Sequence, residues 1–292
     1  MIPAFTTPCM KEFELVSVES GVKSIRSLDF GQTFHPVTGP MAEARALHVV
    51  QQRLAERAAA NQTGFVIWDV GFGAAANSIA AIETLSGRGG RIRISSFDRT
   101  TASIEFALEH ASDLEYVKAH ETVLRKLLSD KTANIADPDS GTRIEWQLHI
   151  GDFCEVVRNP PREAPHAIFY DPYSPAANPD MWTLEHFSLL RKHLDEEVPC
   201  LWTNYTRSTA VRATLLLAGF FVGRGCAIGG KEETTVASND LRLVKRPLDA
   251  RWLERAARSA NAAPLRGGGI SPAKIATKDL ESLKAHPQFT DR

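Results

Sequence analysis

Four aspartates each follow an apolar stretch of strand length, and their carboxylates are suited to binding the polar groups of a ligand. They are Asp69, Asp98, Asp152 and Asp171. In an open α/β sheet the carboxyl ends of parallel strands meet at one edge, and ligands bind beyond that edge. Each aspartate alone could be an ordinary loop residue. The four together predict a ligand site at the edge of such a sheet.

A glycine turn directly follows the first of these aspartates. Gly71-Phe72-Gly73 comes after a buried strand that ends near Asp69, and a helix is expected from Asn77. Ala76 replaces the third glycine of the dinucleotide-binding fingerprint, so the spacing leaves a nicotinamide enzyme open. Asp69 argues against that reading, because it would repel a pyrophosphate and attract a cationic amino group. This favours an amino-acid-bearing nucleoside such as S-adenosylmethionine, with a strand-to-helix turn of another α/β protein as the alternative.

The next two strand ends suit the rest of such a nucleoside. Asp98 can accept hydrogen bonds from both ribose hydroxyls. Asp152 can accept one from an adenine amine, with the neighbouring Phe153 covering the ring. Glu43 precedes the first strand and could hold the ammonium of the methyl donor. The expected donor-binding residues are Glu43, Asp69, Gly71, Phe72, Gly73, Asn77, Asp98, Asp152, Phe153 and Asp171.

The stretch from Tyr170 to Trp182 holds three prolines, two tyrosines and two aspartates directly after a buried strand. Proline restricts the backbone, so this loop is expected to be rigid. Asp171 and Tyr173 are the expected catalytic residues. The carboxylate could hold an amine and help to remove its proton, while Tyr173 could stack on a base or face the methyl group. Asp180 is expected to be the N-cap of the helix that follows.

The segment around His35, Glu43 and Arg45 could fold over the donor as a lid. His35 is interpreted as an ordinary loop residue. Residues 13–28 alternate in polarity around a short turn and predict a β-hairpin. A helix is predicted over residues 41–60.

Strand and helix patterns then alternate along the chain, which predicts a mostly parallel seven-stranded sheet with helices on both faces. The strands are expected at 65–70, 91–97, 143–150, 167–170, 198–203, 219–227 and 233–245, the last two pairing antiparallel. The helices are expected at 77–86, 101–112, 117–129, 182–193, 207–218 and 250–260. Residues 131–142 are predicted to form a polar loop, and a flexible tail is predicted from Asn261. The expected division is an N-terminal hairpin and lid helix (1–60), a core domain (61–250) and a basic C-terminal helix and tail (251–292).

The composition is that of an ordinary globular protein, with 43% hydrophobic and 24% charged residues among 292. No apolar run is long enough for a transmembrane helix, and residues 1–8 do not read as a signal peptide, so the cytoplasm is expected. The cysteines, Cys9, Cys154, Cys200 and Cys226, form no Cys-x-x-Cys pair, so neither zinc nor another metal is expected. The net charge is −1, but residues 241–292 carry eleven Lys or Arg against five Asp or Glu. This basic segment could contact phosphates or form a solvated tail.

Three stretches resemble the MnmC-like methyltransferases, the methyltransferase domain of the bacterial enzyme that makes 5-methylaminomethyl-2-thiouridine at the tRNA wobble position. They are residues 38–45 (TGPMAEAR), 69–77 (DVGFGAAAN) and 171–182 (DPYSPAANPDMW). The third is the most specific, and the similarity extends over roughly residues 13–245. The resemblance implies a class I methyltransferase fold that uses S-adenosylmethionine. It also implies tRNA as the partner and Asp171 at the position where the aminomethyl nitrogen is methylated.

The chain also departs from this family's pattern. The best-known members carry a second, flavin-dependent oxidase domain for which this chain has no room, so a stand-alone form is expected. Ala74 stands where many members have Thr. Asp171 is followed by Pro-Tyr-Ser-Pro where many have Gly-Phe-Ala-Pro.

Three hypotheses follow. The first is an N-methyltransferase acting on a modified uridine of tRNA. The second keeps the fold and donor but has a different methyl acceptor, because Asp-Pro-Tyr is loosely similar to the Asp-Pro-Pro-Tyr loop of enzymes that methylate adenine or glutamine. A related version is an enzyme that uses another aminoalkyl donor and acts on a small amine. The third is a non-catalytic RNA-binding relative, against which the four intact aspartates argue.

Overall fold

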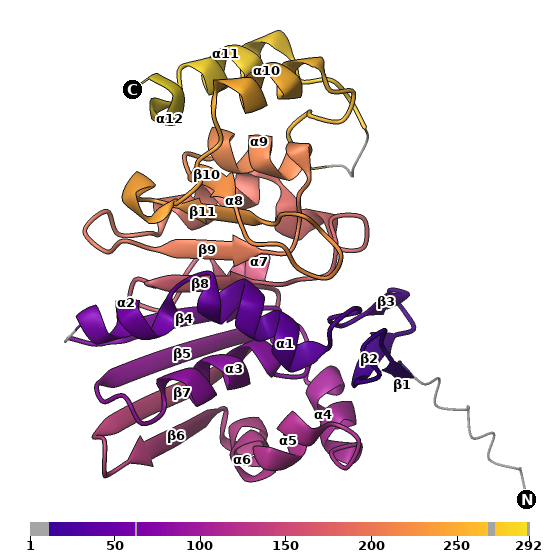
Figure 1. The fold of residues 1–292 in the computed structure, drawn as a ribbon, viewed down its shortest axis with the longest axis vertical. Helices are drawn as coiled ribbons and strands as arrows, with labels where there is room; N and C mark the ends of the chain where they lie inside the picture. The colour runs from indigo at the N-terminus through magenta and orange to yellow at the C-terminus, as the bar shows by residue number, and fades with distance from the viewer. Residues whose placement is uncertain (1–11, 62, 268–271, 291–292) are drawn as a thin grey trace, which may run out of the picture.

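An eight-stranded sheet forms the centre of the protein in the computed structural model, which describes residues 12–61, 63–267 and 272–290 (Figure 1). The strand order is β10-β11-β9-β8-β4-β5-β7-β6. The strands are β4 (Phe65–Val70), β5 (Arg91–Asp98), β6 (Thr132–Asp137), β7 (Thr142–Ile150), β8 (Ala167–Tyr170), β9 (Leu201–Asn204), β10 (Phe221–Arg224) and β11 (Thr235–Ser238).

The five central strands, β9, β8, β4, β5 and β7, run parallel, and β6, β11 and β10 pair antiparallel at the two sides. The expected antiparallel pairing of the last two strands is confirmed. Every residue of β4 is buried, as expected for a strand covered on both faces. Ile67 packs into the hydrophobic cluster on one face, whereas Trp68 and Val70 pack into the cluster on the other.

Helices cover both faces of this sheet (Figure 1). They are α1 (Pro40–Ala44), the π-helix η1 (Arg45–Val50), α2 (Leu54–Ala60), α3 (Ala76–Leu85), α4 (Ala102–Glu109), α5 (Glu115–Ala119), α6 (Glu121–Asp130), α7 (Phe153–Val156), the 3₁₀ helix η2 (Pro179–Trp182), α8 (Leu184–Lys192), α9 (Thr209–Leu217), the 3₁₀ helix η3 (Leu241–Leu243), α10 (Ala250–Arg258), α11 (Thr277–Lys284) and α12 (Pro287–Thr290).

The predicted hairpin is present as β1 (Phe13–Ser17) and β2 (Lys23–Ser27), which pair antiparallel and are joined by β3 (Gln32–Thr33). This small sheet lies beside α1 and α4 (Figure 1). The single helix predicted over 41–60 is wrong, because it is divided into α1, η1 and α2. Arg53 adopts a left-handed conformation at the break, and Gln52 donates to the Ile168 carbonyl at 3.1 Å. The pattern of apolar residues in the sequence does not reveal such a hydrogen bond to the sheet.

The polar loop predicted at 131–142 is wrong, because residues 132–137 form β6 and extend the sheet from seven strands to eight. An edge strand exposes much of its surface, so its polar residues hide the strand pattern. Ala133, the most buried residue of β6, packs into the core.

The flexible tail predicted from Asn261 is also wrong for the described residues 272–290, which form α11 and α12. Leu283 is fully buried. The side chain of Gln288 receives a hydrogen bond from the Val222 N–H at 2.7 Å and donates to the carbonyls of Val222 and Leu248 at 2.9 and 2.8 Å. The end of the chain therefore packs against β10. The predicted helix at 250–260 is confirmed as α10.

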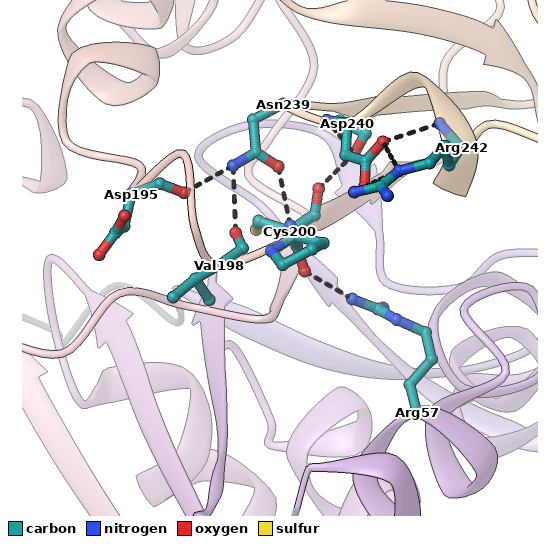
Figure 2. A network of polar contacts seen from close by, with 9 residues as sticks. Arg57, Asp195, Val198, Cys200, Asn239, Asp240 and Arg242 are labelled. Atoms are coloured by element: carbon teal, nitrogen blue, oxygen red, sulfur yellow. Dashed lines mark hydrogen bonds and ion pairs between the residues drawn. The ribbon is translucent and has the colours of Figure 1, made fainter.

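A second network fixes the loop at the amino end of β9 (Figure 2). The Asn239 side chain accepts from the Cys200 N–H at 2.8 Å and donates to the Asp195 carbonyl at 2.9 Å. Arg57 of α2 donates to the Pro199 carbonyl at 3.2 Å. These contacts tie α2 to the sheet at the end opposite the carboxyl edge.

Among the described residues, no helix has the length and apolar character needed to cross a bilayer. The first eight residues and Cys9 lie outside the described part of the chain, as do Gly268 and Gly269.

Candidate active site

A cavity of about 620 Å³ lies at the carboxyl edge of the parallel strands, within the usual size range of small-molecule sites. Its walls come from the ends of β4, β5, β7 and β8, from α3, and from the small N-terminal sheet. The predicted site residues that line it are Glu43, Gly71, Phe72, Gly73, Asn77, Asp98, Asp152, Phe153, Asp171 and Tyr173.

The glycine turn is packed directly against the end of β8. Gly71 has φ +89°, and a Cβ placed on it would lie 2.6 Å from the carbonyl oxygen of Asp171. Its N–H and that of Phe72 both donate to the Phe97 carbonyl at 3.0 Å. Only glycine permits this conformation together with this close approach. The turn therefore sets the position of Asp171.

Asp69 is the one predicted donor-binding residue that does not line the cavity. The strand continues to Val70, and the Asp69 side chain is fully buried on the α3 side. It accepts hydrogen bonds from Ser78 at 2.5 Å and Ser96 at 3.2 Å. Burial raises the pKa of Asp69 to about 7, although these two hydrogen bonds oppose the rise. Its placement makes it a buried connection between β4, β5 and α3 and gives no support to the expected contact with the donor.

The next two strand-end aspartates do line the cavity. Asp98 accepts the Gly73 N–H at 2.8 Å, and its burial raises the pKa of this carboxyl. Asp152 is the N-cap of α7 and receives hydrogen bonds from the Cys154 N–H and from Arg99. Burial acts to raise the pKa of Asp152, but these hydrogen bonds outweigh it and the pKa is lowered. Arg99 is not among the site residues predicted from the sequence. Its position directly after Asp98, at a strand end, could have indicated that it lies at the site.

Asp171 stands at the centre of the cavity wall with a side chain that is 16% exposed. Asn77 Nδ2 donates to its Oδ2 at 3.0 Å, and His35 Nε2 lies 3.9 Å from the same oxygen. Burial raises the pKa of Asp171, with His35 and the Asn77 hydrogen bond acting against it. Asn77 Oδ1 is buried and has no hydrogen-bond partner among the described residues. The Asn77 amide thus holds the Asp171 carboxylate in place, while its own Oδ1 is not exposed to the cavity.

Glu43 lines the cavity and also forms hydrogen bonds to the backbone of the loop before α1. Its Oε1 accepts the N–H groups of Val37 and Thr38, each at 2.9 Å. These bonds fold the loop that carries His35 over the cavity. Lys231, which sequence reasoning missed, also lines the cavity, and its ammonium lies 4.9 Å from the centre of the Tyr205 ring.

Tyr173 lies in an aromatic group at the cavity. Its ring stacks on Phe30 with centroids 4.1 Å apart, and Phe34 lies 5.9 Å away. Burial raises the pKa of Tyr173 to about 12. Gln32 holds the same loop through a 2.7 Å hydrogen bond to Ser174. Both phenylalanines belong to a segment that the sequence shows only as irregular.

The predicted N-cap at Asp180 is wrong. Asp180 lies inside η2, and Thr183 caps α8 by accepting the His186 N–H at 3.2 Å. The rigid loop is held by Trp182, whose Nε1 donates to the Tyr173 carbonyl at 3.0 Å. Within the part of the chain that the structure describes, no three His, Cys, Asp or Glu side chains are grouped to hold a metal.

Comparison with known proteins agrees with this geometry. A family described as S-adenosyl-L-methionine-dependent methyltransferase matches residues 115–240. The tRNA 5-methylaminomethyl-2-thiouridine biosynthesis bifunctional protein MnmC of Pseudomonas fluorescens is 30% identical over 290 residues, which cover 90% of this chain and 42% of that protein. The MnmC protein of Aeromonas hydrophila is 27% identical over 274 residues, covering 87% and 40%. The chain thus spans about two fifths of the length of these relatives.

Among solved structures, MNMC2 from Aquifex aeolicus has the same fold, with a TM-score of 0.67 and 23% identity over 96% of this chain and 86% of that chain. Fold and family model together define a class I S-adenosylmethionine-dependent methyltransferase, as expected. Within this class the chain is similar in sequence to MnmC proteins over most of its own length, which agrees with the resemblance seen in the motifs.

The cavity fits S-adenosylmethionine in size and chemistry. Its volume of about 620 Å³ suits a nucleoside with an amino-acid tail. Carboxylates stand at the ends of β5 and β7, where the ribose and base of a nucleoside bind in open α/β sheets. The buried Asn77 Oδ1 is an acceptor that still lacks a donor.

Proposed function

We propose that this protein transfers a methyl group from S-adenosylmethionine to the aminomethyl nitrogen of a modified wobble uridine in tRNA, converting 5-aminomethyl-2-thiouridine to 5-methylaminomethyl-2-thiouridine. The observation that carries the proposal is the Asp171 carboxylate in the cavity wall, which the Asn77 amide holds in place. The names of the relatives supply the substrate class. A cytoplasmic location is part of the same proposal.

The donor would be held along the carboxyl edge of the sheet. Asp98 would bind the ribose, Asp152 and Phe153 the adenine, and the turn at Gly71 and Gly73 would lie under the amino-acid portion. When bound, S-adenosylmethionine supplies an electrophilic methyl group. Arg99 orients Asp152, and Glu43 keeps the loop around His35 closed over the cavity. Asp69 is not assigned a contact with the donor, since its side chain is buried on the α3 side and does not line the cavity.

The acceptor would be held by its amine and by its base. The Asp171 carboxylate, held by the Asn77 amide, would accept a hydrogen bond from the amine and orient it. The rate would come mainly from aligning the two reactants. Tyr173 is already stacked on Phe30, and Phe30 is 43% exposed. We therefore assign the outer face of Phe30 to stacking with the uridine, and Tyr173 to supporting it.

Two experiments test this function. Calorimetric titration should show binding of S-adenosylmethionine, and no detectable binding would contradict every methyltransferase assignment for this site. Mass analysis of tRNA nucleosides should show the aminomethyl precursor accumulating in cells that lack this chain. Normal nucleosides in those cells would favour another amine acceptor, such as a nucleobase, protein side chain or small molecule.

A matched pair of variants examines the catalytic carboxylate. Asp171→Ala should abolish turnover and leave donor binding largely intact. Asp139→Ala, on the exposed turn between β6 and β7, should leave both unchanged. Normal turnover by Asp171→Ala would show that this residue does not have its assigned role. If the unaltered protein bound tRNA but methylated no amine, a non-catalytic RNA-binding relative would be favoured.

A further inference from the structure

His35 has a backbone conformation that is unusual for a residue with a side chain. Its φ of +47° lies in the left-handed region that glycine favours. The chain is tied on both sides of it: the Phe34 N–H donates to the Ile25 carbonyl at 2.8 Å, and the Val37 N–H donates to Glu43 at 2.9 Å. Such conformations persist only where the surroundings impose them, and they cluster at functional sites. The fold therefore holds the His35 side chain in place at a cost in stability.

The imidazole of His35 faces Asp171 across the cavity. Its Nε2 lies 3.9 Å from Asp171 Oδ2, and its side chain is 13% exposed. An amine nitrogen can lie within hydrogen-bond distance of both atoms, because two contacts of about 3 Å easily span that separation. A primary ammonium has three N–H donors. The Asp171 carboxylate and His35 Nε2 offer it two acceptors on the wall of one cavity.

The other charged or titratable groups near this pair are already engaged or buried. Glu43 accepts two backbone N–H groups through one oxygen. The ammonium of Lys231 donates to the Tyr205 carbonyl at 3.2 Å and lies over the Tyr205 ring. His48 of η1 is fully buried, and this burial lowers its pKa well below the usual value, so it stays neutral. Among these neighbours, His35 is the basic nitrogen that faces the amine position.

We propose that His35 is the catalytic base, whose Nε2 takes a proton from the acceptor ammonium held against Asp171. The inference rests on the proposed function and deepens it. One N–H bond of the ammonium breaks and an N–H bond forms on the imidazole. The electron pair stays on the amine nitrogen and is free to attack the methyl group. The imidazolium is stabilised by the Asp171 carboxylate and later releases its proton to solvent.

Imidazole suits this step better than a carboxylate does. Imidazole is the side chain whose unperturbed charge change falls near neutral pH, which suits a general base. Asp171 then keeps its charge and orients the amine. This differs from the expectation that His35 is an ordinary loop residue and that Asp171 itself takes the proton.

Two variants separate the imidazole from the backbone conformation. Asn and Gly both adopt positive φ more easily than His does, so His35→Asn and His35→Gly should keep the loop intact. Both should bind S-adenosylmethionine with the affinity of the unaltered protein. On tRNA carrying 5-aminomethyl-2-thiouridine, both should lose roughly 100-fold or more in kcat at pH 7, the lower end of the usual contribution of a general base.

The pH profile and rescue decide the role. The unaltered enzyme should lose activity as pH falls and His35 becomes protonated. The variants should instead gain activity steadily up to pH 9.5, where the amine loses its proton to solvent, and added imidazole should partly restore His35→Gly. If the kcat of both variants at pH 7 lay within threefold of that of the unaltered enzyme, or if their pH profiles were unchanged, the inference about His35 would be overturned and the proposed function would stand. Absence of turnover by the unaltered enzyme would overturn the proposed function, and this inference with it.

Discussion

Replacing Gly71 with Ala should damage both stability and the position of Asp171. The added Cβ would lie 2.6 Å from the Asp171 carbonyl oxygen and 2.9 Å from the Pro172 nitrogen. Both neighbours are backbone atoms, so no side chain can rotate away. Ordinary van der Waals contact begins at 3.4 Å, so the added Cβ and the Asp171 carbonyl oxygen must separate by about 0.8 Å. Either the turn or the end of β8 must move by that distance.

The cost has two parts. An L-residue at positive φ costs roughly 1–2 kcal/mol, and overpacking a close contact costs about 1–3 kcal/mol. The free energy of unfolding should fall by roughly 2–5 kcal/mol, and Tm by roughly 4–10 °C for a chain of this size. Because a misplacement near 1 Å can cost about 100-fold in rate, kcat should fall by a similar factor in protein that remains folded.

Gly73→Ala provides the matched control. Its φ is +52°, and its added Cβ would meet only the edge of the Phe34 ring at 3.4 Å, an ordinary contact. This variant should lose about 1 kcal/mol, or roughly 2 °C in Tm. Thermal unfolding by circular dichroism and turnover at saturating donor would be measured for both. If Gly71→Ala matched Gly73→Ala in Tm and turned over within threefold of normal, the argument that the turn positions Asp171 would be refuted.

Three further outcomes are expected. Burial raises the pKa of Asp69 to about 7 from 3.8, so the protonated carboxyl stabilises the native state below about pH 4, and this contribution is lost as pH rises through about 7. Asp69→Asn should therefore gain Tm relative to the unaltered protein from pH 4 to pH 8, and a pH-independent difference would contradict this. Phe30→Ala should raise KM for tRNA roughly tenfold, because stacking on a base is worth about 1–3 kcal/mol, while donor affinity measured by calorimetry stays the same. Gln288→Ala leaves the buried Val222 N–H and carbonyl without their side-chain partner, so urea unfolding should show a loss of roughly 2–3 kcal/mol, and a loss below 0.5 kcal/mol would argue against that contact.

The residues that line the cavity at the carboxyl edge could be predicted because the strands before them have a clear apolar pattern. Apolar runs of strand length precede Asp98, Asp152 and Asp171, and topology brings the ends of such strands together. Asp69 does not line the cavity, although β4 has the predicted bounds, because the pleat of the strand turns its side chain toward α3. A shift of one residue at a strand end reverses the face that a side chain occupies.

The sequence suggested that the segment around His35 could cover the site, but the contacts that this segment makes could not be predicted. Phe30 and His35 reach Tyr173 and Asp171 only through long-range packing of the small N-terminal sheet against the carboxyl edge. No local period records such a contact. The positive φ of His35 was hidden as well, because only the finished fold imposes it.

The attachment of α12 also governs how the molecule meets other chains. β10 is a terminal strand of the eight-stranded sheet, and its outer edge is covered by two segments. The Leu248 N–H donates to the Val222 carbonyl and the Arg224 N–H to the Arg246 carbonyl, each at 2.9 Å, while Gln288 accepts the Val222 N–H. A terminal strand with free backbone groups is a template for pairing with any extended peptide. Residues 246–248 and the Gln288 side chain together thus protect the outer edge of β10 from pairing with another chain.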